Sequence, residues 1–389
     1  MKIANRMEKL APSLTLSITA LANELKAAGK DILSFSAGEP DFDTPQVVKD
    51  AAIKAINEGK TKYTAVEGIK ETKQAIINKL KKDHNLDYTL DKIVISNGAK
   101  HSLFNLAQAL IDEGDEVIIP SPYWVTYPEL VVYSGGVPVF IETDESTEFK
   151  ITAKQLKEKI TPKTKILMLN SPSNPTGSIY SKDELLAIGE VLKGTDIVVL
   201  SDEMYEKLIY KGKKFTATAE VSSDMYNRTV TINGLSKSVA MTGWRFGYVA
   251  CPNSALAKAM SKLQGQVTSN VNSMTQYAAI VALEGEANKD IEMMRVEFEK
   301  RKDYAVKAIN NISKLSCYDP DGAFYLFINI KKYSNDSMKF CADLLENKGV
   351  ALVPGLAFGM EGYVRLSFAT SMKAIEDGIN RIKEFVENR

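Results

Sequence analysis

The central part of the chain alternates short apolar runs with segments of helical pattern. Five runs are almost continuously apolar: 93–96, 116–120, 165–170, 196–201 and 229–232. The segments between them, such as 99–111, carry apolar side chains at the three- and four-residue spacing of a helix. Continuous apolar strands separated by helices are typical of a parallel sheet that helices cover on both faces. The sequence therefore predicts an α/β fold with a mainly parallel sheet.

The pattern changes near residue 285. The segment 288–312 reads as one long, charged, amphipathic helix, and after it the strands and helices alternate differently. The predicted elements there are a strand at 323–328, a helix ending at Gly349, a strand at 364–368 and a closing helix from Ser371. These elements predict a smaller α+β domain. We expect a large domain over 46–285 and a small domain formed by 1–45 together with 286–389, with boundaries good to about ten residues.

The N-terminal segment allows two interpretations. Basic residues precede a mildly apolar run, as in a secretory signal peptide. However, polar residues and Pro12 interrupt this run, and Ile18, Leu21, Ala22 and Leu25 have helical spacing. We therefore predict a helix of the mature protein that closes at Gly29. No run of 18 apolar residues occurs, so we expect no membrane-spanning segment.

Charge and composition narrow the classes of partner. Lys+Arg and Asp+Glu both number 49, so no net field favours nucleic acid or an anionic membrane. The three cysteines are scattered and only two histidines occur, which leaves little material for a metal site or a Ser-His-Asp triad. Few, unclustered cysteines are typical of a reducing compartment, and we expect a cytoplasmic protein without a metal.

Chemically distinctive residues follow the five predicted strands. In chain order these are Gly98-Ala99-Lys100, Trp124, the loop Asn170-Ser-Pro-Ser-Asn174-Pro-Thr-Gly177, Asp202 with Tyr205, and Lys237. In open α/β sheets, ligands bind beyond the carboxyl ends of the strands. We therefore expect these side chains to meet at one site.

Each of these residues could instead have a purely structural role, without binding a ligand. A glycine turn at a helix N-terminus can bind phosphate or nothing, and Trp124 can stack on a flat ligand or pack in the core. The buried acid Asp202 needs a cationic partner, either a protonated ring nitrogen or a structural arginine. Lys237 is an ordinary surface lysine or a nucleophilic amine, the latter favoured if Arg245, eight residues on, suppresses its charge. Taken together, the five groups fit a phosphorylated pyridine aldehyde.

Five motifs connect this pattern to a family. They are Ala37-Gly-Glu-Pro-Asp-Phe42, Asn174-Pro-Thr-Gly177, Ser201-Asp-Glu-Met-Tyr205, Ser236-Lys237 with Gly243-Trp-Arg-Phe-Gly247, and Val364-Arg-Leu-Ser-Phe368. With these motifs the chain resembles, over nearly its whole length, the fold-type I aminotransferases that use pyridoxal 5'-phosphate (PLP). Within them it is most similar to the shorter bacterial aspartate aminotransferases.

The resemblance implies a role for each cofactor-binding residue. Lys237 forms a Schiff base with PLP and later moves the proton from the substrate, while Asp202 keeps the ring nitrogen protonated. Tyr205 and Asn174 hydrogen-bond the ring hydroxyl oxygen. The remaining cofactor contacts come from Trp124 on the ring face, from Gly98, Ala99 and Arg245 at the phosphate, and from Tyr63, which reaches the phosphate of a neighbouring subunit. The last contact implies a homodimer with shared active sites.

The resemblance also implies the substrates, an amino acid and a 2-oxo acid. Arg365 and Gly38 bind the substrate α-carboxylate, with help from Asn174 and Trp124. Lys100 occupies the position at which relatives that use acidic substrates bind the distal carboxylate. We therefore expect transfer of the amino group of L-aspartate to 2-oxoglutarate, with oxaloacetate and L-glutamate as products.

Two sequence details bear on this expectation. Relatives that accept prephenate carry a basic residue at the position of Ala11, which argues against that activity. Many relatives place Ser or Thr, a phosphate ligand, where this chain has Gly234, so that Ser236 or backbone groups have to take over this contact.

Alternatives from the same fold and from another class remain open at this level. An aromatic or alanine aminotransferase, or a C–S lyase, would use the same cofactor residues. A non-catalytic PLP-binding regulator would be expected to lack Lys237, Asp202 or Arg365, and all three are present.

Overall fold

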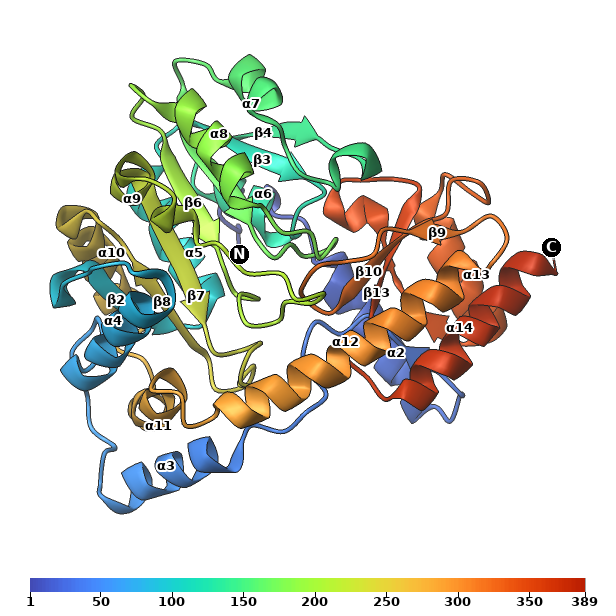
Figure 1. Ribbon diagram of the computed structural model, residues 1–389, viewed down its shortest axis with the longest axis horizontal. Helices are drawn as coiled ribbons and strands as arrows, with labels where there is room; N and C mark the ends of the chain where they lie inside the picture. The colour runs from blue at the N-terminus through green and yellow to red at the C-terminus, as the bar shows by residue number, and fades with distance from the viewer. Residues whose placement is uncertain (389) are drawn as a thin grey trace.

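A seven-stranded sheet forms the centre of the larger part of the computed structural model, which describes residues 1–388 (Figure 1). Its strands are β2 (Ile93–Asn97), β3 (Glu116–Ser121), β4 (Val137–Glu142), β5 (Thr164–Asn170), β6 (Val198–Asp202), β7 (Thr229–Gly234) and β8 (Phe246–Ala250). Their order in space is β2-β8-β7-β6-β5-β3-β4, and only β8 runs antiparallel to its neighbours. The mainly parallel sheet predicted from the sequence is confirmed.

Helices cover both faces of this sheet, as the continuous apolar strands require. One face packs against α5 (Ala99–Leu110), α6 (Thr126–Tyr133) and α10 (Ser254–Val267). The other face packs against two groups of helices. The first group is α3 (Gln46–Asn57), α4 (Lys70–His84) and α11 (Ser273–Leu283), and the second is α7 (Ala153–Lys159), α8 (Lys182–Leu192) and α9 (Ser223–Arg228).

A second sheet organises the C-terminal part. Its order is β12-β13-β10-β9, built from β9 (Ser316–Cys317), β10 (Tyr325–Asn329), β12 (Val353–Pro354) and β13 (Tyr363–Ser367). The helices α12 (Asn288–Asn310), α13 (Ser337–Lys348) and α14 (Met372–Glu387) pack around it. On α14 the predicted apolar face is buried, with Ile375, Ile379 and Ile382 at most 3% exposed.

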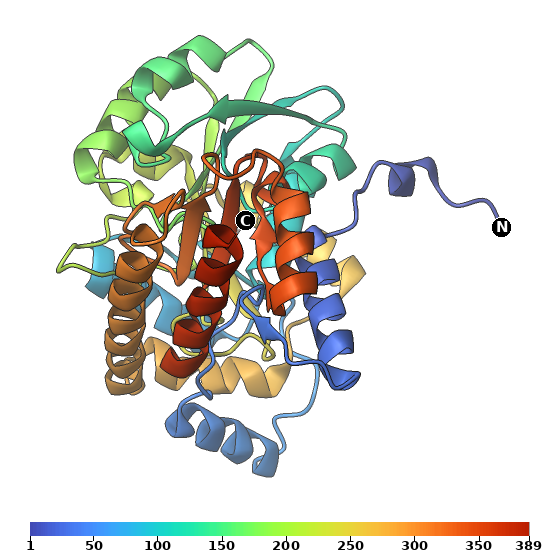
Figure 2. The same ribbon diagram turned by 90° about the vertical axis from the view of Figure 1, so that its right-hand side faces the viewer.

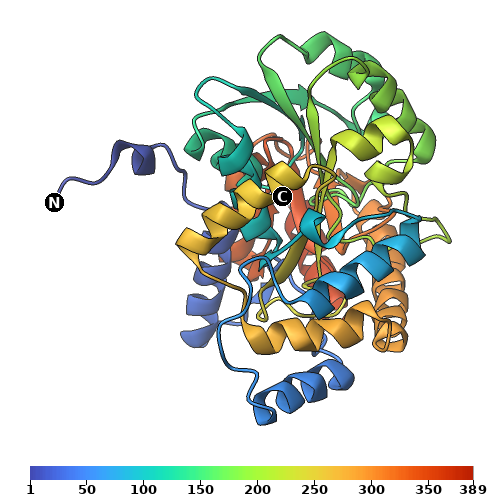
Figure 3. The same ribbon diagram turned by 90° about the vertical axis from the view of Figure 1, so that its left-hand side faces the viewer.

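The N-terminal segment belongs spatially to this second part. The strand β1 (Leu33–Ser34) pairs in parallel with β11 (Val350–Ala351), more than 300 residues later in the chain. The predicted N-terminal helix is present as α2 (Leu14–Ala27), which Figure 2 shows beside the C-terminal elements. Ahead of it, the residues around α1 (Asn5–Glu8) extend away from the rest of the molecule (Figures 2 and 3).

The distribution of strands fits the predicted division into 46–285 and 1–45 with 286–389. All seven strands of the large sheet lie in the first range, and the smaller sheets are built from the second. We propose that these ranges are the two domains, joined by α12, which Figure 1 shows running between them. Short 3₁₀ turns complete the fold at Leu90–Lys92, Glu145–Thr147, Thr218–Glu220 and Gly355–Phe358.

Two strands of the large sheet were not expected from the sequence. The strand β4 lies at the sheet edge, is only partly buried and contains Pro138, so its pattern is weaker than that of a central strand. The strand β8 is fully buried but contains Gly247, which breaks the apolar run. No helix within residues 1–388 has the length and apolar character needed to cross a bilayer.

The direction of the strands positions the functional residues. Because β2 and β7 are both antiparallel to β8, they run parallel to each other and to β3, β5 and β6. The carboxyl ends of these five strands therefore meet at one edge of the sheet, as the sequence interpretation required.

Candidate active site

A cavity of about 410 Å³ lies at the carboxyl edge of the large sheet. Residues of the N-terminal segment and of the C-terminal sheet complete its wall. Ten of the twelve predicted site residues line it: Gly38, Ala99, Lys100, Trp124, Asn174, Asp202, Tyr205, Lys237, Arg245 and Arg365. The structure thus brings together residues that are up to 327 positions apart in the chain.

The amine of Lys237 lies in the loop that follows β7. Its Nζ donates a hydrogen bond to the carbonyl oxygen of Gly38 from the N-terminal segment. Burial lowers the pKa of Lys237 to about 8; the charges of Arg365 and Arg245 act in the same direction, and Glu39 and Asp202 oppose them. A lysine with this pKa has an appreciable unprotonated fraction near neutral pH, as a nucleophilic amine requires.

The carboxylate of Asp202 ends the neighbouring strand β6 and is 4% exposed. Its Oδ2 accepts a hydrogen bond of 2.8 Å from the Tyr127 hydroxyl, and its Oδ1 accepts one of 3.3 Å from the Met204 amide. Burial raises the pKa of Asp202 to about 6, although these hydrogen bonds act against the rise. Within residues 1–388 no cationic side chain forms an ion pair with Asp202, so the structural arginine considered as an alternative is not found.

An anion cradle lies at the start of α5. Gly98 is the N-cap of this helix, with φ +82°, and no side chain caps the free amides behind it. A Cβ on Gly98 would lie 2.5 Å from Nη2 of Arg245, so the guanidinium closely approaches this turn. Free helix-end amides beside a guanidinium form a strong site for a phosphate group.

The close packing of β7 against β8 explains why a glycine occupies position 234. It pairs with Gly247 across β7 and β8, and a Cβ on Gly234 would lie 2.6 Å from the carbonyl oxygen of Phe246. A serine or threonine therefore has no room at this position in the present backbone. Ser236, which lines the cavity, is the side chain of this loop that remains available for a phosphate contact.

The guanidinium of Arg365 enters the cavity from β13 and is 2% exposed. Its Nη1 donates to Oδ1 of Asn174 at 2.9 Å, and its Nη2 donates to the carbonyl oxygen of Ser36 at 2.8 Å. Its Nε is buried without a hydrogen-bond partner, and no carboxylate of residues 1–388 pairs with this charge. A buried guanidinium without an anion suits an anionic ligand such as a carboxylate.

A second cation lies at the rim of the cavity. The Nζ of Lys100 lies 4.9 Å from the centre of the Trp124 ring. Although the residue as a whole is exposed, partial burial of its ammonium group and the charge of Arg245 lower the pKa of Lys100. Trp124 itself is partly buried and contacts Tyr127 edge-on at 5.5 Å, so it serves both as packing and as cavity wall.

Two predicted residues are not among the cavity-lining side chains. Gly98 lies close to the guanidinium of Arg245, but its own amide, which the sequence assigned to the phosphate, donates to the carbonyl oxygen of Ser96 at 2.7 Å. Tyr63 is 88% exposed and lies outside the cavity of its own chain. Its expected contact with a neighbouring subunit stays a prediction.

Two tyrosines of the site were not expected from the sequence. Tyr127, 3% exposed, hydrogen-bonds Asp202, and Tyr325, 1% exposed, lies 2.8 Å from the hydroxyl of Tyr205. Tyr127 lies in α6, whereas Trp124 precedes that helix, so their three-residue spacing does not mark a shared helix face. Tyr325 lies in an apolar strand and resembles a core residue.

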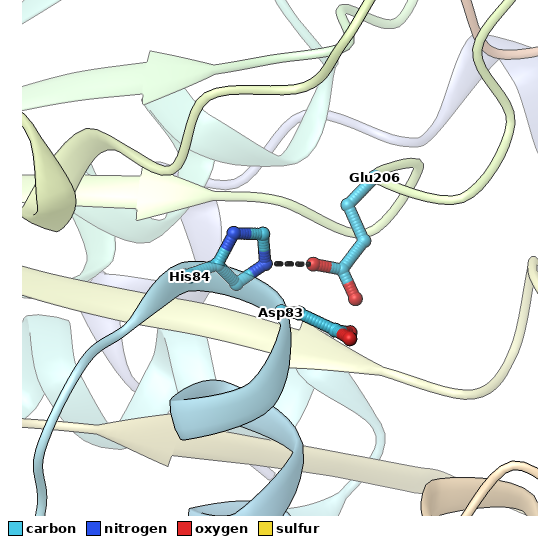
Figure 4. A group of neighbouring side chains, drawn as sticks. All are labelled: Asp83, His84 and Glu206. Carbon is cyan, nitrogen blue, oxygen red and sulfur yellow. Dashed lines mark hydrogen bonds and ion pairs between the residues drawn. The ribbon is translucent and has the colours of Figure 1, made fainter.

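A second group of titratable side chains lies behind the turn that carries Asp202 and Tyr205. Figure 4 shows Asp83 and His84 at the end of α4 facing Glu206. His84 donates to Glu206 at 2.9 Å and to Glu220 at 3.1 Å. Cations already neutralise the acids, since Lys79 pairs with Glu206 and Lys207 with Asp83. The group is therefore an ion-pair network that holds the turn, not a vacant metal site.

The network also fixes the charge of His84. Burial of the ring opposes its protonation, but the hydrogen bonds to Glu206 and Glu220 prevail and raise the pKa of His84 to about 9. Lys79 and His84 hold the pKa of Glu206 well below its usual range against the opposing effect of burial.

Comparison with known proteins identifies the family of the chain. A family model described as aminotransferase class I and II matches residues 30–382. The chain is 50% identical to an aspartate aminotransferase of Geobacillus stearothermophilus, with 100% of both chains covered. It is 46% identical to an aspartate/prephenate aminotransferase of Nitrosomonas europaea, over 98% of this chain and 99% of that protein.

Solved structures of aspartate aminotransferases have the same fold as this chain. The crystal structure of the aspartate aminotransferase from Rhizobium meliloti superposes with a TM-score of 0.96 at 41% identity, covering 100% of this chain and 99% of the other. The aspartate aminotransferase from Thermus thermophilus with maleate gives a TM-score of 0.95 at 38% identity, covering 99% of both chains.

The contact between Tyr127 and Asp202 leads to a prediction for the cofactor-free protein. Y127F removes a hydrogen bond to the ionised carboxylate, so the pKa of Asp202 should rise by about one unit. Titration of ¹³C-labelled aspartate side chains by NMR measures this value. The matched control Y123F changes a tyrosine of the same segment that stacks on Phe140 and should leave Asp202 unaffected. An unchanged Asp202 titration in Y127F would contradict the role given to this hydrogen bond.

The ion-pair network makes stability depend on pH. Since the pKa of His84 is raised from 6.5 to about 9 by folding, its contribution is fully present below pH 6.5 and is lost as the pH rises through about 9. Between about pH 6 and pH 10, H84Q should therefore lose about 3 kcal/mol less stability than the wild type does. Urea unfolding at both pH values measures the difference.

The second histidine provides the control for this experiment. Burial lowers the pKa of His101, the direction opposite to that of His84. Folding therefore disfavours protonation of His101, and H101Q should not reduce the loss of stability between about pH 6 and pH 10. If H84Q lost as much stability between about pH 6 and pH 10 as the wild type does, the network would not hold the protonated imidazole of His84.

Proposed function

Because the chain belongs to the aminotransferase class I and II family, and is thus an aminotransferase, we propose that it transfers the amino group of L-aspartate to 2-oxoglutarate with PLP as cofactor. The products are oxaloacetate and L-glutamate. The observation that carries the proposal is the meeting of Lys237, Asp202 and Arg365 in one cavity, each with its charge unmatched by an ion pair in the described chain.

The residues of the cavity fit PLP. The amides at the start of α5 and Arg245 suit its phosphate, and the buried carboxylate of Asp202 suits a protonated pyridine nitrogen. Tyr205 and Asn174 line the same cavity and would hydrogen-bond the ring hydroxyl oxygen. When bound, PLP supplies an electron-withdrawing ring that accepts the electron pair left at the substrate Cα.

The protein residues perform the other tasks. The Lys237 amine would attach the cofactor through its aldehyde with loss of water, and, once the substrate amine had displaced it, would take the proton from the substrate Cα. Its pKa of about 8 keeps part of this amine unprotonated near neutral pH. The ionised carboxylate of Asp202 would keep the ring nitrogen protonated. The hydroxyl of Tyr127 stabilises this ionised carboxylate by donating a hydrogen bond to it.

Substrate selection rests on two cations that line the cavity. Arg365, oriented by Asn174 and the Ser36 carbonyl oxygen, binds the α-carboxylate, and Gly38 supports it from the N-terminal segment. Lys100 over Trp124 binds the distal carboxylate of aspartate or glutamate. Ala11 offers no basic group, and its amide is bound to Glu129 at 2.8 Å, which argues against prephenate as a second substrate.

We further propose a cytoplasmic homodimer with shared active sites. The three cysteines are buried and unpaired, as expected in a reducing compartment. The exposed Tyr63 supports the dimer, because the position matches a residue that reaches across the interface in relatives. An aromatic or alanine aminotransferase or a C–S lyase would not need the cation of Lys100 at the rim of the cavity. A non-catalytic regulator would not need the lowered pKa of Lys237.

Steady-state kinetics with aspartate, glutamate, alanine and tyrosine as amino donors tests the substrate proposal. K100A should reduce kcat/KM for aspartate and glutamate roughly 10–100-fold, the range expected for one lost hydrogen bond to a charged group. It should leave kcat/KM for alanine unchanged, since alanine has no distal carboxylate.

A second lysine gives the matched control. Lys331 lies over the Tyr363 ring at 4.7 Å but outside the cavity, so K331A should leave all four donors unaffected. Equal loss for aspartate and alanine in K100A, or no loss for aspartate, would contradict the role of Lys100. Full activity in K237A would overturn the proposed reaction itself.

A further inference from the structure

We propose that Tyr325 is a positioning residue that links Arg365 to Tyr205, so that capture of a substrate carboxylate weakens the hydrogen bond from Tyr205 to the cofactor ring. The inference rests on the proposed function and extends it. It gives the small domain a route to the cofactor besides the direct contact between Arg365 and Asn174.

The position of Tyr325 is unusual for a strand residue. It is the first residue of β10, is 1% exposed, and lines the cavity. Its hydroxyl lies 2.8 Å from that of Tyr205, and a Cβ on Gly38 would lie 3.0 Å from it. Tyr325 therefore contacts both the cofactor side and the substrate side of the cavity.

The direction of the hydrogen bond follows from the number of protons. Each neutral phenol donates one hydrogen bond. In the proposed function Tyr205 donates its proton to the ring hydroxyl oxygen, so the proton between the two tyrosines has to come from Tyr325. Within residues 1–388, Tyr205 is the sole hydrogen-bond partner of the Tyr325 hydroxyl. Donation from Tyr325 makes Tyr205 a better donor toward the ring.

Arg365 controls the strength of this donation. Its Cζ lies 4.4 Å from the centre of the Tyr325 ring, and the two residues lie diagonally on the paired strands β10 and β13. A buried cation over the ring face withdraws electron density from the phenol and strengthens its donated hydrogen bond. A carboxylate that pairs with Arg365 cancels this charge, so Tyr325 and then Tyr205 donate less strongly.

The PLP-loaded protein provides a readout that does not depend on turnover. The hydrogen bond from Tyr205 stabilises negative charge on the ring oxygen and lowers the basicity of the nitrogen that joins Lys237 to the ring. The midpoint pH of the visible absorbance change reports this basicity. We expect the midpoint to rise in the wild type when a non-reacting dicarboxylate such as maleate is added.

Y325F should change both quantities. Its midpoint without maleate should exceed the wild-type value by about half a unit to one unit, which corresponds to one lost neutral hydrogen bond. Its maleate-induced rise should be smaller than that of the wild type, because only the route through Asn174 remains. In a Y205F background, Y325F should add no further shift. Y363F, which changes a tyrosine of the paired strand outside the cavity, should match the wild type.

A nearly isosteric change tests the same link should Y325F fold poorly. Incorporation of 3-fluorotyrosine at position 325 makes the phenol a stronger donor and should lower the midpoint. The inference is overturned if Y325F keeps the wild-type midpoint, if its maleate-induced rise is undiminished, or if the fluorinated residue raises the midpoint. A wild-type protein without a visible band would instead reject the proposed function.

Discussion

The structure depends on keeping a buried acid and a partly buried amine at the ends of two adjacent strands. Asp202 ends β6 and Lys237 follows β7, yet neither forms an ion pair with another side chain of residues 1–388. Burial moves their pKa values toward each other, to about 6 and about 8. This state is costly for folding, and the surrounding hydrogen bonds from Tyr127 and to Gly38 make it tolerable. Retention of such a pair is typical of a site shaped for a ligand.

The N-terminal segment joins this pair to the C-terminal part. The backbone carbonyl oxygen of Gly38 accepts a hydrogen bond from Lys237, and that of Ser36 accepts one from Arg365. A few residues of this segment therefore contact both the amine and the guanidinium. The segment is itself tied to the second sheet through the pairing of β1 with β11. A ligand carboxylate at Arg365 therefore acts on the part of the wall that also contacts Lys237.

Much of the fold and site was predictable because the information is local. The apolar runs before Gly98, Trp124, Asp202 and Lys237 identified strands, and the rule that ligands bind beyond carboxyl ends brought the residues together. The family resemblance is confirmed by the comparisons. The edge strand β4 and the strand β8 were missed, because Pro138 and Gly247 weaken their pattern. Tyr127 and Tyr325 were missed because their hydroxyls meet partners 75 and 120 residues away, which no local pattern encodes.

The most direct test of this account is to identify the amine that binds the cofactor. The purified protein would be incubated with PLP, reduced with borohydride, digested and analysed by peptide mass spectrometry. We predict a single pyridoxyl adduct, on Lys237, and none in K237R treated in the same way. An adduct spread over surface lysines, or one that persists elsewhere at the same level in K237R, would contradict the central claim.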